Sequence, residues 1–255
     1  MPVGDYNRPI EPVQEERQLD AGDRLVGDSW VIAQNMGQTV NDKTYSTPGV
    51  FGDVTMPSNW QMSTRGGEGA PNFDYLYTFK PPSAQGDVEI SVFNRGGALS
   101  ERGAQTLDKL LSDNANISSP NVLFDKSWPA NDPRTRLATQ IIRDLAEVLG
   151  RNHQGDNQFT NDSPTGSARA PAFDLEHLEV RKVNGKAVLS VDGKYKNKLT
   201  GATSSHFSGI YAQNEVTRHG NNVSEVHQMY LSSPDSVAFN ANRSGYTRAL
   251  NSIKW

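Results

Sequence analysis

The chain has 255 residues, of which 35% are hydrophobic, with a formal net charge of −4 and no cysteine. This length suffices for one large domain with its own core, and the lack of cysteine excludes disulfides, thiolate metal sites and cysteine nucleophiles. The mildly acidic balance gives no electrostatic reason to expect nucleic acid as a partner, and no stretch reaches the roughly 20 apolar residues of a membrane-spanning helix.

The first 44 residues are predicted to form a flexible arm that docks only in part. Residues 1–28 combine prolines and glycines with many charges, and their few apolar residues follow no period. Trp30 begins the first apolar cluster, which we expect to pack on the domain. Because the N-terminus lacks a charged start followed by an apolar run, we expect no secretory signal peptide. A cytoplasmic location is therefore expected, with export by a route without a classical signal peptide as the alternative.

Residues 45–255 are predicted to form a single domain that begins with short strands. The alternation over 50–56 predicts a strand that ends in a turn at 57–60. Glycines and a proline predict a loop over 63–72. The alternating apolar residues of 73–79 and 88–92 then predict a β-hairpin.

Two amphipathic helices follow. Ser100 can cap a helix over 101–113. A second helix begins at Pro133 after the cap Asp132 and ends before Gly150. Its apolar stripe consists of Leu137, Ile141, Leu145, Val148 and Leu149.

A polar loop over 151–172 precedes the strongest local signal in the chain. Asn184-Gly185 separates the alternating runs 178–183 and 186–195, and this dipeptide favours a two-residue hairpin turn because both of its positions need positive φ. In the second run, one side carries Ala187, Leu189, Val191 and Tyr195, and the other carries Ser190, Asp192 and Lys194. We therefore predict one buried and one solvated face.

The remaining residues predict a second hairpin and a last helix. Segments 206–216 and 223–232 are expected to pair across Gly220-Asn221-Asn222. Ser233 is then expected to cap a helix whose first residue is Pro234. A helical stripe follows at Phe239, Tyr246, Leu250 and Ile253.

This ending resembles the C-terminal signature of the PsbP/Mog-like superfamily, including bacterial DcrB-type members. The shared features are the strand Val226 to Ser233, Pro234, a helix with an early Phe239, and the ending Leu250-Asn-Ser-Ile-Lys-Trp255. Upstream, Met56-Pro57-Ser58-Asn59-Trp60 is similar to the turn that ends the first strand of that group. The resemblance implies an α+β fold, namely an α/β/α sandwich with a central antiparallel sheet and flanking helices. It implies a function in binding and assigns no catalytic residue.

Three groups of residues are candidates for a site. If the second hairpin forms, Glu225 and His227 share a strand face near His219 and could hold a metal, although exposed histidines beside a solvated glutamate are the alternative. Asp174 and Glu176 lie together beside His177 and could act as a carboxylate pair, or they could form an exposed strand start. The apolar parity changes near His177, which predicts a β-bulge there.

Trp60 and Trp128 lie beside prolines and could be exposed anchors for a partner, or buried plugs of their loops. The glycine-rich turns lack phosphate-loop spacing, and no Gly-x-Ser-x-Gly elbow occurs. We assign no catalytic, cofactor or metal residue. The expected function is that of a non-catalytic protein-binding or accessory module. The alternatives are an enzyme or exported bacterial effector with a site assembled from loop 151–172, and a metal- or small-ligand-binding protein.

Overall fold

The computed structural model describes residues 41–66, 75–82, 86–94, 101–129, 131–145, 172–197, 200–218 and 221–255. Eight of its strands form one antiparallel sheet in the order β3-β4-β5-β10-β9-β8-β7-β6, and β1 pairs with β2 as a separate two-stranded unit. The predicted arm up to residue 40, the Trp30 cluster and most of the polar loop, up to residue 171, lie outside the described residues.

The strand bounds are β1 (Asp42–Ser46), β2 (Asp53–Pro57), β3 (Gln61–Gly66), β4 (Tyr75–Lys80), β5 (Glu89–Asn94), β6 (Asn121–Asp125), β7 (Ala172–Val183), β8 (Lys186–Lys196), β9 (Thr203–Arg218) and β10 (Asn221–Ser233). The helices are α2 (Glu101–Asp113), α3 (Pro133–Asp144) and α4 (Ser236–Ser252). Of these described helices, none is long and apolar enough to cross a membrane.

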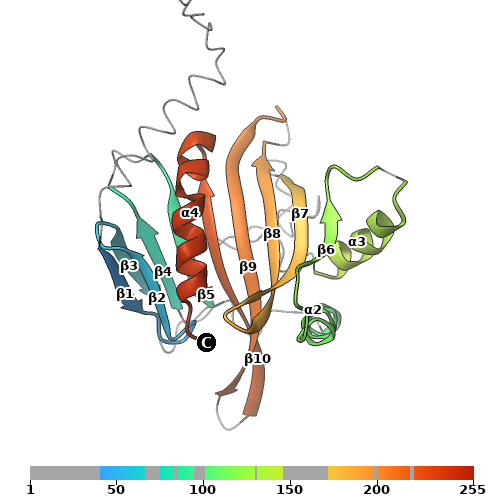
Figure 1. Ribbon diagram of the computed structural model, residues 1–255, viewed down its shortest axis with the longest axis horizontal. Coiled ribbons are helices and arrows are strands. Elements are labelled where there is room, and N and C mark those ends of the chain that lie inside the picture. The colour runs from blue at the N-terminus through green and yellow to red at the C-terminus, as the bar shows by residue number, and fades with distance from the viewer. Residues whose placement is uncertain are drawn as a thin grey trace, which may run out of the picture.

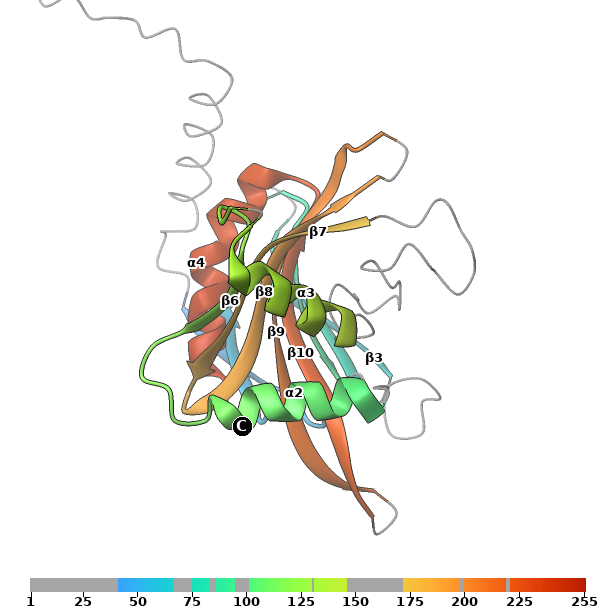
Figure 2. The same cartoon turned by 90° about the vertical axis from the view of Figure 1, so that its right-hand side faces the viewer.

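Helices cover both faces of the large sheet, so the fold is an α+β structure with α/β/α layers. Figure 1 looks onto the face that carries α4, and Figure 2 shows α2 and α3 on the opposite side. The β9–β10 hairpin extends beyond the other strands at the lower end of both views.

Neighbouring residues of the central strands supply two separate cores. On the α4 side, Val188 and Ile210 pack with Phe239 and Leu250 of the helix and with Met56 of β2. On the other side, the adjacent Leu189 and Tyr211 pack with residues of α2 and α3. Because successive side chains of a strand point to opposite faces, each central strand needs apolar residues at both parities.

The β7–β8 hairpin confirms the predicted turn but corrects the predicted solvated face. Asn184 and Gly185 have φ of 46° and 83°, as the two-residue turn requires. The correction concerns the end of β8 near the turn, where Val188 is 0% and Ser190 7% exposed; the side chains of Asp192 and Lys194, further along the same side, keep 28% and 33% of their exposure, as predicted. Local alternation could not reveal this, because a helix more than 40 residues downstream covers that end of the strand.

The last helix begins two residues later than predicted. Asp235 is its N-cap and accepts hydrogen bonds from the amides of Val237 and Ala238. Ser233 instead accepts a bond from the Asp235 amide, at 3.1 Å from its Oγ. The expected apolar stripe of α4 is buried, as predicted.

Smaller differences concern short elements at the sheet edges. Residues 63–66, predicted as loop, belong to the edge strand β3, and the edge strand β6 was not predicted. Both strands are short and have little alternation to reveal them. In α3, Leu137 is 62% exposed while Ala138 is buried, so the buried stripe lies one position later than expected at that end; Val148 and Leu149 lie outside the described residues.

The two-core arrangement can be tested at adjacent positions of β8. We expect Val188→Ala to lower the free energy of unfolding by about 1–3 kcal/mol and Leu189→Ala by about 2–5 kcal/mol, because each leaves a cavity in a different core. Lys182→Ala, at an exposed position of β7, should change it by less than about 0.5 kcal/mol. Urea denaturation measures all three. A negligible loss for either core variant would contradict a sheet that is covered on both faces.

Candidate functional site

The part of the sheet beside α4 carries a dense set of charged side chains. Figure 1 shows β7 and β8 next to α4, with no described helix in front of them. We call this region the open charged face and define it by Asp125, Lys126, Asp174, Glu176, His177, Glu179, Arg181, Asp192, Lys194, Lys196 and Arg243. Its five carboxylates equal its five Lys or Arg side chains in number, apart from His177.

Ion pairs across the strands fix most of these charges. Asp174 Oδ2 lies 2.6 Å from Lys126 Nζ and 2.5 Å from Lys196 Nζ. Glu176 pairs with Lys194 at 2.7 Å. Burial alone would raise the pKa of Asp174, but the hydrogen bonds from the two lysines outweigh it and lower that pKa. This carboxyl group is therefore held ionised, which does not suit a general acid.

His177 bridges two carboxylates on the same face. Its Nδ1 lies 3.1 Å from Asp125 Oδ2, and its Nε2 lies 3.2 Å from Glu179 Oε2. Burial lowers the pKa of His177, but the bonds to Glu179 and Asp125 outweigh this effect and raise it. Hydrogen bonds from Ser127, with a further one from His177, lower the pKa of Asp125 to about 2. The geometry thus favours an imidazolium between two carboxylates.

The predicted β-bulge explains how these groups come to share one face. The register between β7 and β8 shifts between Leu175 and His177, as the change of apolar parity indicated. An extra residue in one strand reverses the facing of the residues that follow. Phe173 and Leu175 can therefore pack in the same core as Leu178, which lies beyond the bulge at the other parity.

A second polar group is buried beneath the loop that joins β1 to β2. We call it the buried polar row: it consists of the buried Asn94 of β5 and Glu225 and His227 of β10, together with the half-buried Asn214 of β9. Asn94 Nδ2 donates to Glu225 Oε2 at 2.7 Å and to the Gly49 carbonyl at 2.9 Å. Asn214 Nδ2 lies 2.7 Å from His227 Nδ1. Burial lowers the pKa of His227, although Glu225 and the Val50 backbone oppose this effect.

The expectation for the metal candidates is confirmed in part and corrected in part. Glu225 and His227 do share a strand face, with His227 Nε2 3.7 Å from Glu225 Oε2. They are not exposed, however, since they are only 2% and 3% accessible. The loop that joins β1 to β2, whose Phe51 ring packs against His227, lies too far away in sequence to reveal this cover. His219 lies outside the described residues, and within the described ranges no three His, Asp or Glu side chains gather as metal ligands.

The two tryptophan candidates differ in exposure. Trp60 is 3% exposed, and its carbonyl accepts a bond from the Tyr45 hydroxyl, so it is a buried plug. Trp128 is half-buried beneath the Arg134 guanidinium, which lies 3.7 Å from the ring centroid.

Sequence reasoning missed Asn94, Asn214 and Asp125, because their partners come from distant strands. The single local signal was a polar Asn94 at the end of an apolar strand.

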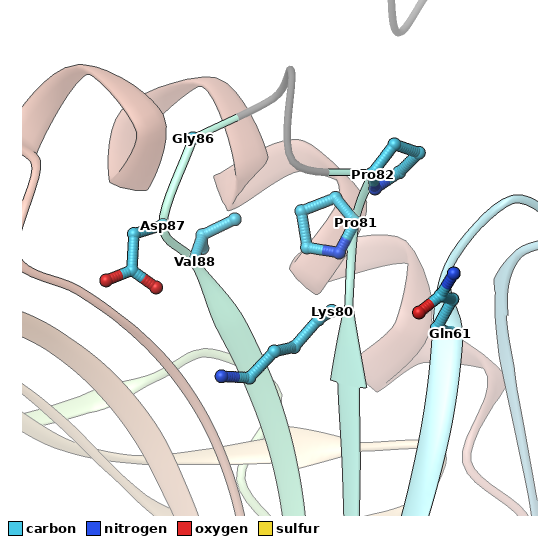
Figure 3. A pocket seen from close by; sticks show the side chains of 7 residues that line it. All are labelled: Gln61, Lys80, Pro81, Pro82, Gly86, Asp87 and Val88. Atoms are coloured by element: carbon cyan, nitrogen blue, oxygen red, sulfur yellow. The ribbon is translucent and has the colours of Figure 1, made fainter.

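Two of the hollows on the described surface lie beside strands of the large sheet. One of about 470 Å³ lies at the ends of β3, β4 and β5, and Figure 3 shows Lys80 and Asp87 at its walls with Pro81 and Pro82. Lys80 and Asp87 are exposed, so the hollow is a depression of the solvated surface. The other, of about 370 Å³, lies between α2 and the β9–β10 hairpin. No residue that lines either hollow belongs to the open charged face or to the buried polar row.

The bridging histidine gives a defined pH dependence. A raised pKa in the folded state stabilises the protein fully below the ordinary pKa of histidine, near 6.5, and this contribution is lost as the pH rises through the folded pKa. We expect the stability difference between the native chain and His177→Gln to shrink between pH 6 and pH 9, by less than about 1 kcal/mol because the pair is partly solvated. Denaturation at a series of pH values measures it. His206→Gln should not show this trend, because the pKa of His206 is lowered, chiefly by burial; a difference that grows with pH would contradict the bridge.

Comparison with known proteins gives a likeness in structure. No family model matches the chain, and no curated protein matches it. Among solved structures, it is similar to the cyanobacterial PsbP protein CyanoP from Synechocystis sp. PCC 6803, with 14% identity and a TM-score of 0.45 over 84% of this chain and 92% of that chain. At these values we transfer no residue role or partner. The resemblance to the PsbP/Mog-like superfamily, with its DcrB-type members, stays a prediction from the sequence.

Proposed function

We propose that this chain is a non-catalytic binding module that holds a protein partner on its open charged face. The observation that supports this proposal most directly is the absence of any described element, on the side of α4, over β6 and over the parts of β7 and β8 that lie beyond the buried Val188 and Ser190. The other side of these strands packs against α2 and α3. A layered fold normally covers its sheet faces, so a broad uncovered face is a natural place for a partner.

The number of charges on this face exceeds what stability requires. Surface ion pairs contribute a median of about 0–1 kcal/mol each, and many contribute nothing measurable. Interfaces, in contrast, use fixed charges of both signs to select a partner and accelerate its approach. Pairing holds Lys194 and Lys196 in place on β8, so less side-chain entropy is lost on binding. The partner fitting this pattern is a protein surface of mixed charge.

The same contacts weigh against the enzyme alternative for the described residues. Asp174 is neutralised by two lysines, and Glu176 by one. A general acid–base pair needs at least one carboxyl group whose pKa is raised toward neutrality, and the pKa of Asp174 is lowered. The loop 151–172, which that alternative also uses, lies outside the described residues up to residue 171.

The proposal can be tested by capture with two charge-matched variants. The face variant carries Lys126→Gln, Lys194→Gln and Lys196→Gln, and the control carries Lys43→Gln, Lys80→Gln and Lys109→Gln, which are exposed elsewhere. Both lose three positive charges. From cross-linked native lysate, we expect the face variant to recover at least about tenfold less of a specific protein than the control, with recovery falling as salt increases. Equal recovery by both variants, or no specific protein at all, would contradict the proposal.

A thermal-shift series with divalent metals, nucleotides and common metabolites distinguishes the proposed protein-binding function from the alternative of a metal- or small-ligand-binding protein. A ligand at 100 times its Kd stabilises a folded protein by about 2.7 kcal/mol, which moves the Tm of a chain this long by several degrees. A protein-binding module should give a flat series. A shift of that size would favour a small-ligand site over the proposed function.

A further inference from the structure

Residues 47–52, which we call the capping loop, seal the buried polar row from above. Asn94 Nδ2 donates to the Gly49 carbonyl at 2.9 Å, which ties the loop to β5. The Phe51 ring packs edge-on against His227, with 6.0 Å between centroids, and against Trp255 at 5.2 Å. The loop is also bound to the end of the chain, since the Gly52 amide donates to the Lys254 carbonyl at 2.7 Å.

The hydrogen bond from Asn214 determines the tautomer of His227. The amide Nδ2 is a donor, so His227 Nδ1, at 2.7 Å, accepts and carries no proton. The single ring proton of the neutral imidazole therefore sits on Nε2. That nitrogen is buried and has no hydrogen-bond partner among the described residues. Its nearest charged neighbour is Glu225 Oε2, at 3.7 Å.

A second proton has no suitable place in this arrangement. It would sit on Nδ1 and face the Asn214 amide, so that two donors would oppose each other. The resulting charge would be enclosed at a residue that is 3% exposed, where desolvation is costly. Burial accordingly lowers the pKa of His227.

The ionisable groups around His227 have opposing effects. Glu225, on the same strand, favours the imidazolium, and Lys186 of β8 disfavours it. From β4, the Tyr77 hydroxyl binds the Pro48 carbonyl of the capping loop at 2.9 Å. On the far side of the loop, Lys254 pairs with Asp53 at 2.9 Å. The capping loop itself, Thr47 to Gly52, has no ionisable side chain, and β5 and β9 present Asn94 and Asn214.

We propose that His227 is an acid-sensitive latch, and that its protonation releases the capping loop together with Trp255 from the sheet. Opening lets water reach the imidazolium and lets Asn214 turn its amide. The Phe51 ring, which now covers His227, would leave with the loop. This inference is independent of the proposed function, because the buried polar row and the open charged face share no residue.

Hydrogen exchange followed by mass spectrometry tests the latch on the full-length chain. Exchange is compared at pH 7.5 and pH 4.5 after correction for the intrinsic rate. Each unit by which folding lowers the pKa of a histidine makes opening tenfold more favourable below that pKa. We therefore expect protection in peptides over 47–52 and 250–255 to fall by at least about tenfold at pH 4.5. Peptides from β8 should stay protected; unchanged protection over 47–52, or an equal loss in β8, would overturn the proposal.

Variants of the row identify the responsible group. His227→Gln cannot titrate and should keep the capping loop protected at pH 4.5, whereas the control His206→Gln should lose protection like the native chain. Glu225→Gln should deepen the loss in acid, because it removes the charge that favours the imidazolium and so lowers the pKa of His227 further in the closed state. If His227→Gln lost protection of the capping loop already at pH 7.5, the assignment of the latch to protonation of His227 would be overturned. If that variant does not fold, the NMR titration of the native His227 Hε1 decides: its midpoint must coincide with that of the exchange transition.

Discussion

The pairing of β10 along both of its edges is the constraint on which the rest of the structure depends. Met229 lies opposite Val92 of β5 on one side and Ile210 of β9 on the other. The contact with β5 closes a loop of more than 100 residues, whose entropic cost only a fully formed sheet repays. The same strand leads into α4, whose Tyr246 hydroxyl donates back to the Met229 carbonyl at 2.9 Å. Strand β10 thus joins the two halves of the chain.

Cover by helices divides the sheet into an apolar and a charged part. Where α4 lies on the sheet, the facing residues are apolar, because buried charges would cost several kcal/mol each. Beyond α4, on β7 and β8, the same side carries ion pairs with solvent access. Arg243 marks the boundary, reaching from α4 to Asp192 of β8 at 3.1 Å. The bulge before His177 places the charges of β7 on this side while Leu178 stays in the opposite core.

In the buried polar row, unlike on the open charged face, hydrogen bonds rather than solvent compensate the polar side chains. Asn94, Glu225 and His227 lie under protein with the half-buried Asn214 beside them, and their hydrogen bonds to one another and to Gly49 offset much of the desolvation penalty. A partly satisfied network is sensitive to any change in protonation. A charge on His227 would disturb both the amide of Asn214 and the loop above it, while the surface pairs on β7 and β8 tolerate water and salt.

The sequence by itself determined the elements whose signals are local: the Asn184-Gly185 turn, the helix over 101–113, the hairpins and the bulge at His177. It also placed Glu225 and His227 on one face, because strand parity is fixed by the backbone. Only the tertiary structure decided which faces are covered, and hence that Ser190 and His227 are buried and that Asp174 and Glu176 meet lysines of other strands. The reason is physical: periodicity reports which residues share a face, whereas burial and charge pairing depend on segments such as the capping loop and α4 that lie far away in sequence.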